Sequence, residues 1–94
     1  MDSELLSLFE EHVRIGKGLP PQSADHMLIA YAYYKQSVVG DNVHQRPVHS
    51  DVIRTFKHDA WVRLKGTSKE DAMRGYIAHI QMLVELSKEE GRLG

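Results

Sequence analysis

The chain has 94 residues, with 12 lysines and arginines, 13 aspartates and glutamates, a formal net charge of −1 and no cysteine. This length suits one small domain, expected over residues 1–94, and the lack of cysteine excludes disulfides and thiolate metal sites. The near-neutral charge argues against general nucleic-acid binding. No apolar run approaches the roughly 20 residues of a membrane span, and the acidic start does not resemble a signal peptide. We therefore expect a cytoplasmic protein without stable membrane insertion.

Four helical segments are predicted, and the first covers Asp2 to Ile15. Its apolar side consists of Leu5, Leu6, Phe9 and Val13. The glycines and prolines of residues 16–21 are expected to end this helix. A second helix is predicted from Ser23 or Ala24 to about Ser37, and it is apolar on more than one side. Such a helix suits packing against other helices on one face and an apolar ligand on another.

A connection without predicted secondary structure runs from Val38 to about Asp51. A loop of this length in a small domain is unusual and often functional. The third helix is predicted from Asp51 to Leu64, with Trp61 as a core residue between helices. Its buried stripe is expected to consist of Ile53, Phe56, Ala60 and Leu64.

The fourth helix is predicted from Ser68 to about Lys88. The segment before it fits a capping box, in which the Thr67 hydroxyl and the Glu70 carboxylate bind free amides of the first turn. The core stripe is expected to consist of Met73, Ile77, Ile80 and Val84. The neighbouring row, which is more polar, consists of Ala72, Tyr76, His79 and Leu83. This arrangement predicts Tyr76 at the edge of the core.

The most informative group of residues lies on the second predicted helix. Tyr31, Tyr34 and Lys35 stand at i, i+3 and i+4, so a helix places them in one surface patch. The phenols offer flat faces and hydroxyl donors, and the ammonium is a point charge suited to phosphate. The patch therefore suits a ligand with a flat base and a phosphate close by. Tyrosines at this spacing are more often core residues, so the patch alone leaves packing and ligand binding both open.

Further motifs accompany this patch in a specific order. They are Tyr31-x-x-Tyr34-Lys35-Gln36, Val39-Gly40-Asp41, Arg46-Pro47, Asp59-Ala60-Trp61, Leu64 to Met73, and Tyr76. In this order and spacing, over about Met27 to Leu86, the chain resembles the acyl-CoA-binding protein family of small cytosolic carriers. The resemblance implies an all-α fold, an antiparallel up-down-down-up four-helix bundle with the ligand in a bowl between the helices.

Members of this family bind medium- and long-chain acyl-CoA thioesters and perform no chemistry on them. The resemblance therefore implies an intracellular carrier and pool buffer of acyl-CoA in fatty-acid metabolism and transport. We expect a monomer that is not an enzyme and that has neither a cofactor nor a metal site. Its expected partner is the small-molecule ligand, long-chain acyl-CoA.

The resemblance also implies a set of ligand-binding residues. The family's ligand positions fall on Tyr31, Tyr34, Lys35, Lys57, Tyr76, Met27 and Leu28. By analogy the two lysines neutralise the 3′-phosphate of the coenzyme, and Tyr31 donates a hydrogen bond to it. The other two tyrosines line the adenine and ribose site. Met27 and Leu28 contact the acyl chain.

The chain departs from the family pattern in the third helix. The family commonly has a tryptophan directly after the helix-three lysine, and here that residue is His58. The stretch before it, usually rich in lysine and glycine, is Ile53 to Phe56, in which Arg54 offers an alternative phosphate contact. These departures leave a second hypothesis open, a protein-interaction module that keeps the fold with weak or altered lipid binding.

The histidines and serines do not predict a metal or catalytic site. The six histidines are His12, His26, His44, His49, His58 and His79. No pair has the i, i+4 spacing of helical metal ligands, so solvated or packing roles are expected. Ser50 and Asp51 near His49 lack a nucleophile-elbow pattern.

Overall fold

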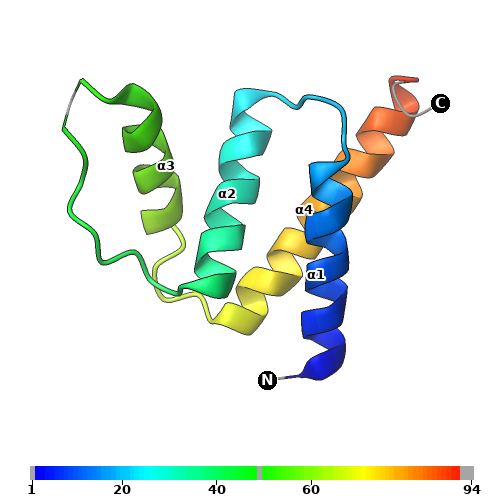
Figure 1. Ribbon diagram of the computed structural model, residues 1–94, viewed down its shortest axis with the longest axis horizontal. Helices are drawn as coiled ribbons and strands as arrows, with labels where there is room; N and C mark the ends of the chain where they lie inside the picture. The colour runs from blue at the N-terminus through cyan, green and yellow to red at the C-terminus, as the bar shows by residue number, and fades with distance from the viewer. Residues whose placement is uncertain (1, 49, 92–94) are drawn as a thin grey trace.

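The computed structural model describes residues 2–48 and 50–91, and within these ranges the regular structure is four helices without a strand. The helices are α1 (Ser3–Lys17), α2 (Ala24–Val38), α3 (Val52–Val62) and α4 (Lys69–Glu89). In Figure 1, α1 runs upward, α2 and α3 run downward and α4 runs upward, which confirms the predicted antiparallel bundle. No helix in the described part of the chain is long and apolar enough to cross a membrane.

Each helix begins with a polar side chain that accepts a hydrogen bond from an amide of the first turn. These N-cap residues are Asp2, Ser23, Asp51 and Ser68. For α4 the cap predicted at Thr67 is wrong by one residue. Ser68 has the extended backbone of an N-cap, and its Oγ accepts from the Asp71 amide at 3.0 Å. The Thr67 amide instead donates to the Leu64 carbonyl, in the turn that precedes the helix.

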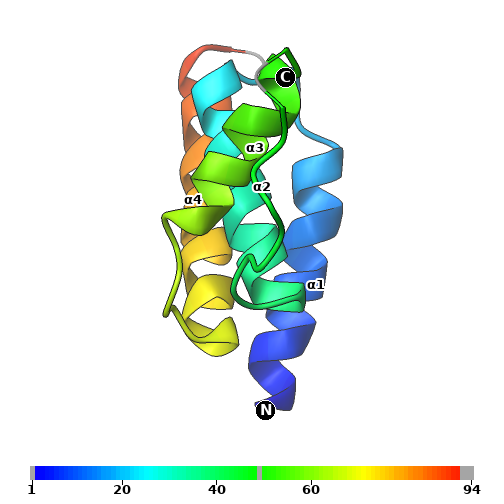
Figure 2. The ribbon, with the colours of Figure 1, turned by 90° about the vertical axis from the view of Figure 1, so that its left-hand side faces the viewer.

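The helices lie in a row rather than around a common axis. α4 packs against both α1 and α2, and α3 packs against α2. Among the described residues, α1 has no close backbone contact with α2, and α3 has none with α4. The molecule measures 41 × 35 × 16 Å, and Figure 2 views this thin layer from its edge. A row of helices leaves hollows between neighbouring helices.

The core is centred on α4, which has two buried rows of side chains. The predicted stripe is largely confirmed, because Met73, Ile77 and Ile80 are buried. The row expected to be more polar is buried as well; it consists of Ala72, Tyr76, His79 and Leu83. Tyr76 is therefore inside the core, at 6% exposure, and not at its edge. The reason is that α4 meets two helices and buries a face against each.

The buried stripe predicted for α3 is wrong. Ile53 and Phe56 are 69% and 56% exposed, whereas Thr55 and Trp61 are the buried residues of this helix. Burial of Trp61 confirms its predicted core position. The Thr55 hydroxyl donates to the Asp51 carbonyl at 2.8 Å, which satisfies the polar group of this buried side chain. The apolar stripe of α3 consequently has no helix packed over it.

Two predicted helix ends also differ from the structure. α1 continues through Gly16 to Lys17, beyond the predicted end at Ile15. Gly16 serves packing here, because a Cβ at this position would lie 3.0 Å from the Tyr76 hydroxyl oxygen. α3 ends at Val62, before the predicted end, and hydrogen-bonded turns follow it.

Candidate functional site

Two lysines on neighbouring helices lie against aromatic rings at the α2–α3 contact. Lys57 Nζ on α3 is 5.4 Å from the ring centroid of Tyr31 on α2, and Lys35 Nζ on α2 is 5.3 Å from the Trp61 ring on α3. These distances fit cation–π contacts. Within the described residues neither ammonium forms an ion pair with a carboxylate. Both positive charges are therefore available to an anionic ligand.

A pocket of about 360 Å³ opens beside Tyr31 and Lys57. We call it the basic pocket; its lining consists of Tyr31, Asn42, His44, Gln45, Pro47, Arg54, Lys57, His58 and Trp61. None of these residues is an aspartate or a glutamate, while Arg54 and Lys57 are cations and two more are histidines. Lys35 does not line this pocket, but its Nζ lies over the ring of Trp61, which does. The composition suits a phosphate group.

A second hollow, of about 470 Å³, lies between α1, α2 and α4. We call it the aromatic pocket; it is lined by Val13, Gly16, Lys17, Leu19, Gln22, His26, Met27, Ala30, Tyr31, Tyr34, Tyr76, Ile80 and Leu83. Tyr31 lines this pocket and the basic pocket, so the two adjoin at its ring. One ligand can thus place a flat group in one hollow and an anion in the other.

The tyrosines of the aromatic pocket are held by a cluster of rings. The Phe9 ring stacks on Tyr34 with centroids 6.1 Å apart and meets Tyr76 edge-on at 5.2 Å. Tyr34 and Tyr76 are 6.4 Å apart. Burial raises the pKa of Tyr76, so its phenol stays neutral and keeps its hydroxyl hydrogen. The rings therefore form a rigid apolar wall with phenol hydroxyl groups.

A third hollow, of about 780 Å³, lies between α2 and α3. We call it the apolar groove; it is lined by Ala24, Asp25, Leu28, Ile29, Ala32, Tyr33, Phe56, Asp59, Ala60, Arg63 and Leu64. Leu28 lies here, whereas Met27 lines the aromatic pocket and is 61% exposed. The structure therefore does not bring these two predicted acyl-chain contacts together in one hollow. Phe56, which was predicted to be buried, lines this groove instead.

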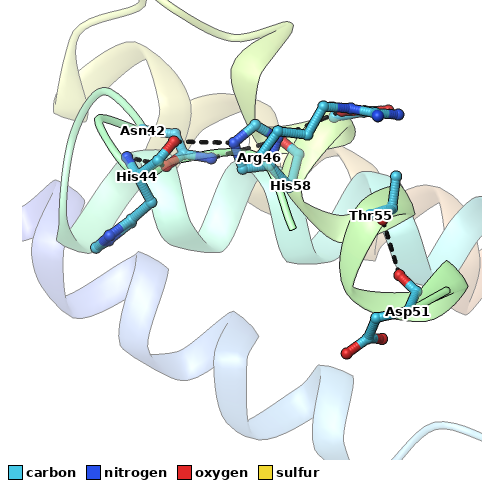
Figure 3. A network of polar contacts seen from close by, with 7 residues as sticks. Asn42, His44, Arg46, Asp51, Thr55 and His58 are labelled. Atoms are coloured by element: carbon cyan, nitrogen blue, oxygen red, sulfur yellow. Dashed lines mark hydrogen bonds and ion pairs between the residues drawn. The ribbon is translucent and has the colours of Figure 1, made fainter. Parts of the chain in front are cut away.

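The connecting segment that walls the basic pocket is held against α3 by polar contacts (Figure 3). Arg46 donates two hydrogen bonds of 3.0 Å to the Asp59 carboxylate. Asn42 Nδ2 lies 3.5 Å from the His58 carbonyl, and the His44 carbonyl lies 3.0 Å from His58 Nε2. Hydrogen bonds from Arg46, and then from His58, lower the pKa of Asp59 to about 2. The segment is thus an ordered wall of the pocket.

Gln36, directly after Lys35, joins three parts of the chain although it is completely buried. Its Nε2 donates to Asp41 Oδ1 at 2.8 Å and to the Thr67 carbonyl at 2.9 Å. Its Oε1 accepts from Trp61 Nε1 at 3.1 Å. The Gly66 amide, and secondly Gln36, lower the pKa of Asp41. This hub fixes the end of α2, and with it the start of the connecting segment.

The structure brings the predicted ligand residues together in part. Tyr31 and Lys57 meet at the basic pocket, and the aromatic pocket gathers Met27, Tyr31, Tyr34 and Tyr76. Sequence reasoning did not single out His44 as a pocket residue, and the only available signal was its place next to the Arg46-Pro47 motif. It likewise gave Gln36 no role beyond membership of a motif. Neither residue stands out by periodicity, because their partners lie far away in the sequence.

The histidines do not gather around one point. Within the described residues no group of three or more histidine, cysteine, aspartate or glutamate side chains is placed to hold a metal ion. His12 and His79 are buried, in line with the expected packing roles. His12 Nδ1 lies 2.8 Å from the Leu8 carbonyl, and His79 Nε2 lies 3.1 Å from the His26 carbonyl. His49 lies outside the described residues.

Comparison with known proteins identifies relatives over most of the chain. The family model described as "Acyl CoA binding protein" matches residues 7–80. The chain is 42% identical over 78 residues to the acyl-CoA-binding protein of Saccharomyces cerevisiae, which covers 82% of this chain and 90% of that one. It is 44% identical over 78 residues to the acyl-CoA-binding protein of Gossypium hirsutum, with 82% and 88% covered.

Solved structures give the same result for the fold. The crystal structure of Oryza sativa acyl-CoA-binding protein 2 is similar with a TM-score of 0.87 at 36% identity, over 90% of this chain and 96% of that chain. That of the protein from Moniliophthora perniciosa is similar with a TM-score of 0.83 at 32% identity, over 92% and 86%. The row of four helices, the adjoining basic and aromatic pockets and these relatives together show that the chain belongs to the acyl-CoA-binding protein family.

Proposed function

We propose that this protein binds medium- and long-chain acyl-CoA esters as an intracellular carrier and pool buffer. The observation that carries the proposal is the pair of lysines, one on α2 and one on α3, that lie at the pocket region without a carboxylate partner. Residues 1–94 act as a single acyl-CoA-binding domain, a monomer in the cytoplasm. In this proposal the protein performs no chemistry on the ester and uses no cofactor, in keeping with relatives that are named for acyl-CoA binding.

The head group is assigned to the two adjoining pockets. Lys57 and Lys35 neutralise the 3′-phosphate, and the Tyr31 hydroxyl donates a hydrogen bond to it. The aromatic pocket takes the adenine and ribose, with Tyr34 and Tyr76 along its wall. What supports this assignment is the position of Tyr31, which lines both hollows, and the neutral state of Tyr76. A ligand that lacks either the base or the phosphate fills only one pocket.

The acyl chain is assigned to the apolar groove, which Leu28 lines, and Met27 is assigned a contact with the ligand from the aromatic pocket. The exposed stripe of α3 supports this, because Phe56 would otherwise keep more than half of its surface in water. Each buried methylene of the chain contributes roughly 0.8 kcal/mol before ordering costs are subtracted. The ligand thus supplies the apolar partner that this helix lacks among the described residues.

Titration calorimetry with palmitoyl-CoA, free coenzyme A and palmitate tests the proposal. We expect one-to-one binding of the thioester, with much weaker binding of either half. Absence of binding to all three compounds would refute the carrier function. In that case the exposed Ile53 and Phe56 favour the second hypothesis, a module that binds a protein partner through α3.

A lysine variant tests the residue assignment separately. The double substitution Lys35→Met and Lys57→Met is expected to weaken palmitoyl-CoA binding about 10- to 100-fold, because each lysine contributes a partly solvated charge-assisted contact. Lys88→Met is the matched control, since Lys88 is a lysine on α4 paired with Glu85 and lining none of the three hollows. Equal affinities of the double variant and the control would rule out the assigned phosphate contacts.

A further inference from the structure

Both ring nitrogens of His58 face hydrogen-bond acceptors. The side chain is only 12% exposed, and Figure 3 shows it between α3 and the connecting segment. Nδ1 lies 3.3 Å from Asp59 Oδ1, and Nε2 lies 3.0 Å from the backbone carbonyl oxygen of His44. A carbonyl oxygen only accepts, and the Asp59 carboxylate, with its pKa lowered to about 2 chiefly by Arg46, also only accepts at neutral pH.

The protonation state of His58 therefore decides how many of these contacts are hydrogen bonds. A neutral imidazole carries one N–H and donates to one of the two acceptors, which leaves the other facing a nitrogen lone pair. The imidazolium carries two N–H groups and donates to both. Histidine is the side chain whose charge ordinarily changes between pH 5 and 8, which makes this pH range the one to test.

Charged and titratable groups approach His58 from each neighbouring part of the chain. They are Arg54, Lys57 and Asp59 on α3, His44 and Arg46 on the connecting segment, and Tyr31 on α2. Asp59 stands between Arg46 and His58, so an imidazolium has its counterion in place. Arg54 and Lys57 line the same pocket and oppose a further positive charge while the pocket is empty. An anion in the pocket neutralises them and removes that opposition.

We propose that His58 is a protonation-dependent positioning residue, which latches segment 42–46 onto α3 and couples binding of the anionic head group to proton uptake. The latched segment contributes Asn42, His44 and Gln45 to the wall of the basic pocket. Protonation thus allows both hydrogen bonds at once, which strengthens the hold of the wall on α3, and adds a positive charge beside the anion. This inference rests on the proposed function for its ligand, but the latch itself exists in the free protein.

The first test is the pH dependence of palmitoyl-CoA binding, measured calorimetrically from pH 8 to pH 5.5. The wild type is expected to bind about threefold to tenfold more tightly at the acidic end, relative to His58→Gln, which has no titrating group there. Comparison at each pH cancels the titration of the ligand phosphate itself, which has a second pKa near 6. His44→Gln controls for the side chain of this residue, since the latch uses only its backbone carbonyl. Because this side chain lines the basic pocket, the control is judged by how its affinity changes with pH and not by the affinity itself.

The outcomes of this titration separate the two proposals. The latch is supported if the affinity of the wild type relative to His58→Gln rises toward acidic pH, and the affinity of His44→Gln relative to His58→Gln rises as well. Parallel profiles of wild type and His58→Gln overturn it, as does a pH dependence lost only in His44→Gln. Absence of binding by the wild type at every pH overturns the proposed function instead.

A second measurement decides the latch without any ligand. Trp61 is the single tryptophan, its Nε1 donates to the Gly40 carbonyl, and its ring centroid is 5.8 Å from the His44 ring. Its fluorescence therefore reports on the connecting segment. We expect an emission change between pH 8 and pH 5.5 in His44→Gln and none in the double variant His44→Gln with His58→Gln, because both lack the His44 ring beside Trp61. An emission of His44→Gln that does not change, or the same change in the double variant, overturns the latch whatever the ligand experiment gives.

Discussion

Replacement of Gln36 by methionine should destabilise the protein by about 2 kcal/mol. Methionine has nearly the same length and helix propensity, so the change removes hydrogen bonds without leaving a large cavity. The buried amide loses its bonds to the Thr67 carbonyl and to Trp61 Nε1, at about 1 kcal/mol each. Trp61 Nε1 keeps its second acceptor, the Gly40 carbonyl at 2.8 Å, so the indole is not left unpaired. The bond to Asp41 adds nothing to this sum, because that carboxylate is exposed.

Urea unfolding followed by far-UV circular dichroism measures this change. Gln81→Met is the matched control, since Gln81 is exposed on α4, and its effect should stay within about 0.5 kcal/mol. A double-mutant cycle with Trp61→Phe isolates the contact between the two side chains, with an expected coupling of about 1 kcal/mol. If Gln36→Met were no less stable than the control, the assignment of Gln36 as a structural hub would be wrong.

Three further predictions concern packing, pH and the tail. Gly75→Ala should destabilise the protein by about 1 kcal/mol in urea unfolding, because a Cβ there would lie 2.4 Å from the Tyr33 ring and this overpacking outweighs the gain in helix propensity. A variant more stable than wild type would contradict this. Burial lowers the pKa of His79 in the folded protein, so its contribution to stability is complete above pH 6.5 and decreases at lower pH, where the unfolded chain takes up a proton. His79→Gln should therefore reduce the change of the urea midpoint between pH 7 and pH 5, and an unchanged pH dependence would refute this. Phe56→Ser should change stability by less than about 0.5 kcal/mol, but in calorimetry it should weaken palmitoyl-CoA binding about 5- to 30-fold and leave the binding of free coenzyme A unaffected. Equal weakening of the binding of both ligands would place Phe56 away from the acyl chain.

The helices could be predicted from the sequence because each has a polar cap and an apolar period. The same reasoning failed where burial depends on what lies opposite. In α3 the period correctly found an apolar stripe, but Phe56 borders an open groove, and the buried position next to it is Thr55. In α4 two helices cover adjacent faces, so the row with His79 is as buried as the apolar stripe. Periodicity identifies a face of a helix but not the element that covers it.

In the candidate site, too, local spacing predicted some neighbours and could not predict others. The spacing of Tyr31 and Tyr34 on one helix was sufficient to group them, because local geometry alone decides it. The meeting of Tyr31 with Lys57, 26 positions later, was expected only through family resemblance. The contact of the His44 carbonyl with His58 could not be predicted from either source, since a backbone oxygen carries no side-chain signal.

The position of α3 at the end of the row has a consequence for how the free protein moves. Among the helices its backbone contacts only α2, and it contributes only Thr55 and Trp61 to the buried interior. Regions with so few buried contacts open locally at a lower free energy than the rest of a protein. The amides of α3 should therefore exchange with deuterium through a partial opening that leaves α1, α2 and α4 folded. If the acyl chain occupies the groove as proposed, it covers the free side of this helix, and exchange in α3 should slow more than elsewhere when the ligand binds. The acyl chain would then serve as a removable part of the hydrophobic core, and its release would leave α3 with few buried contacts again.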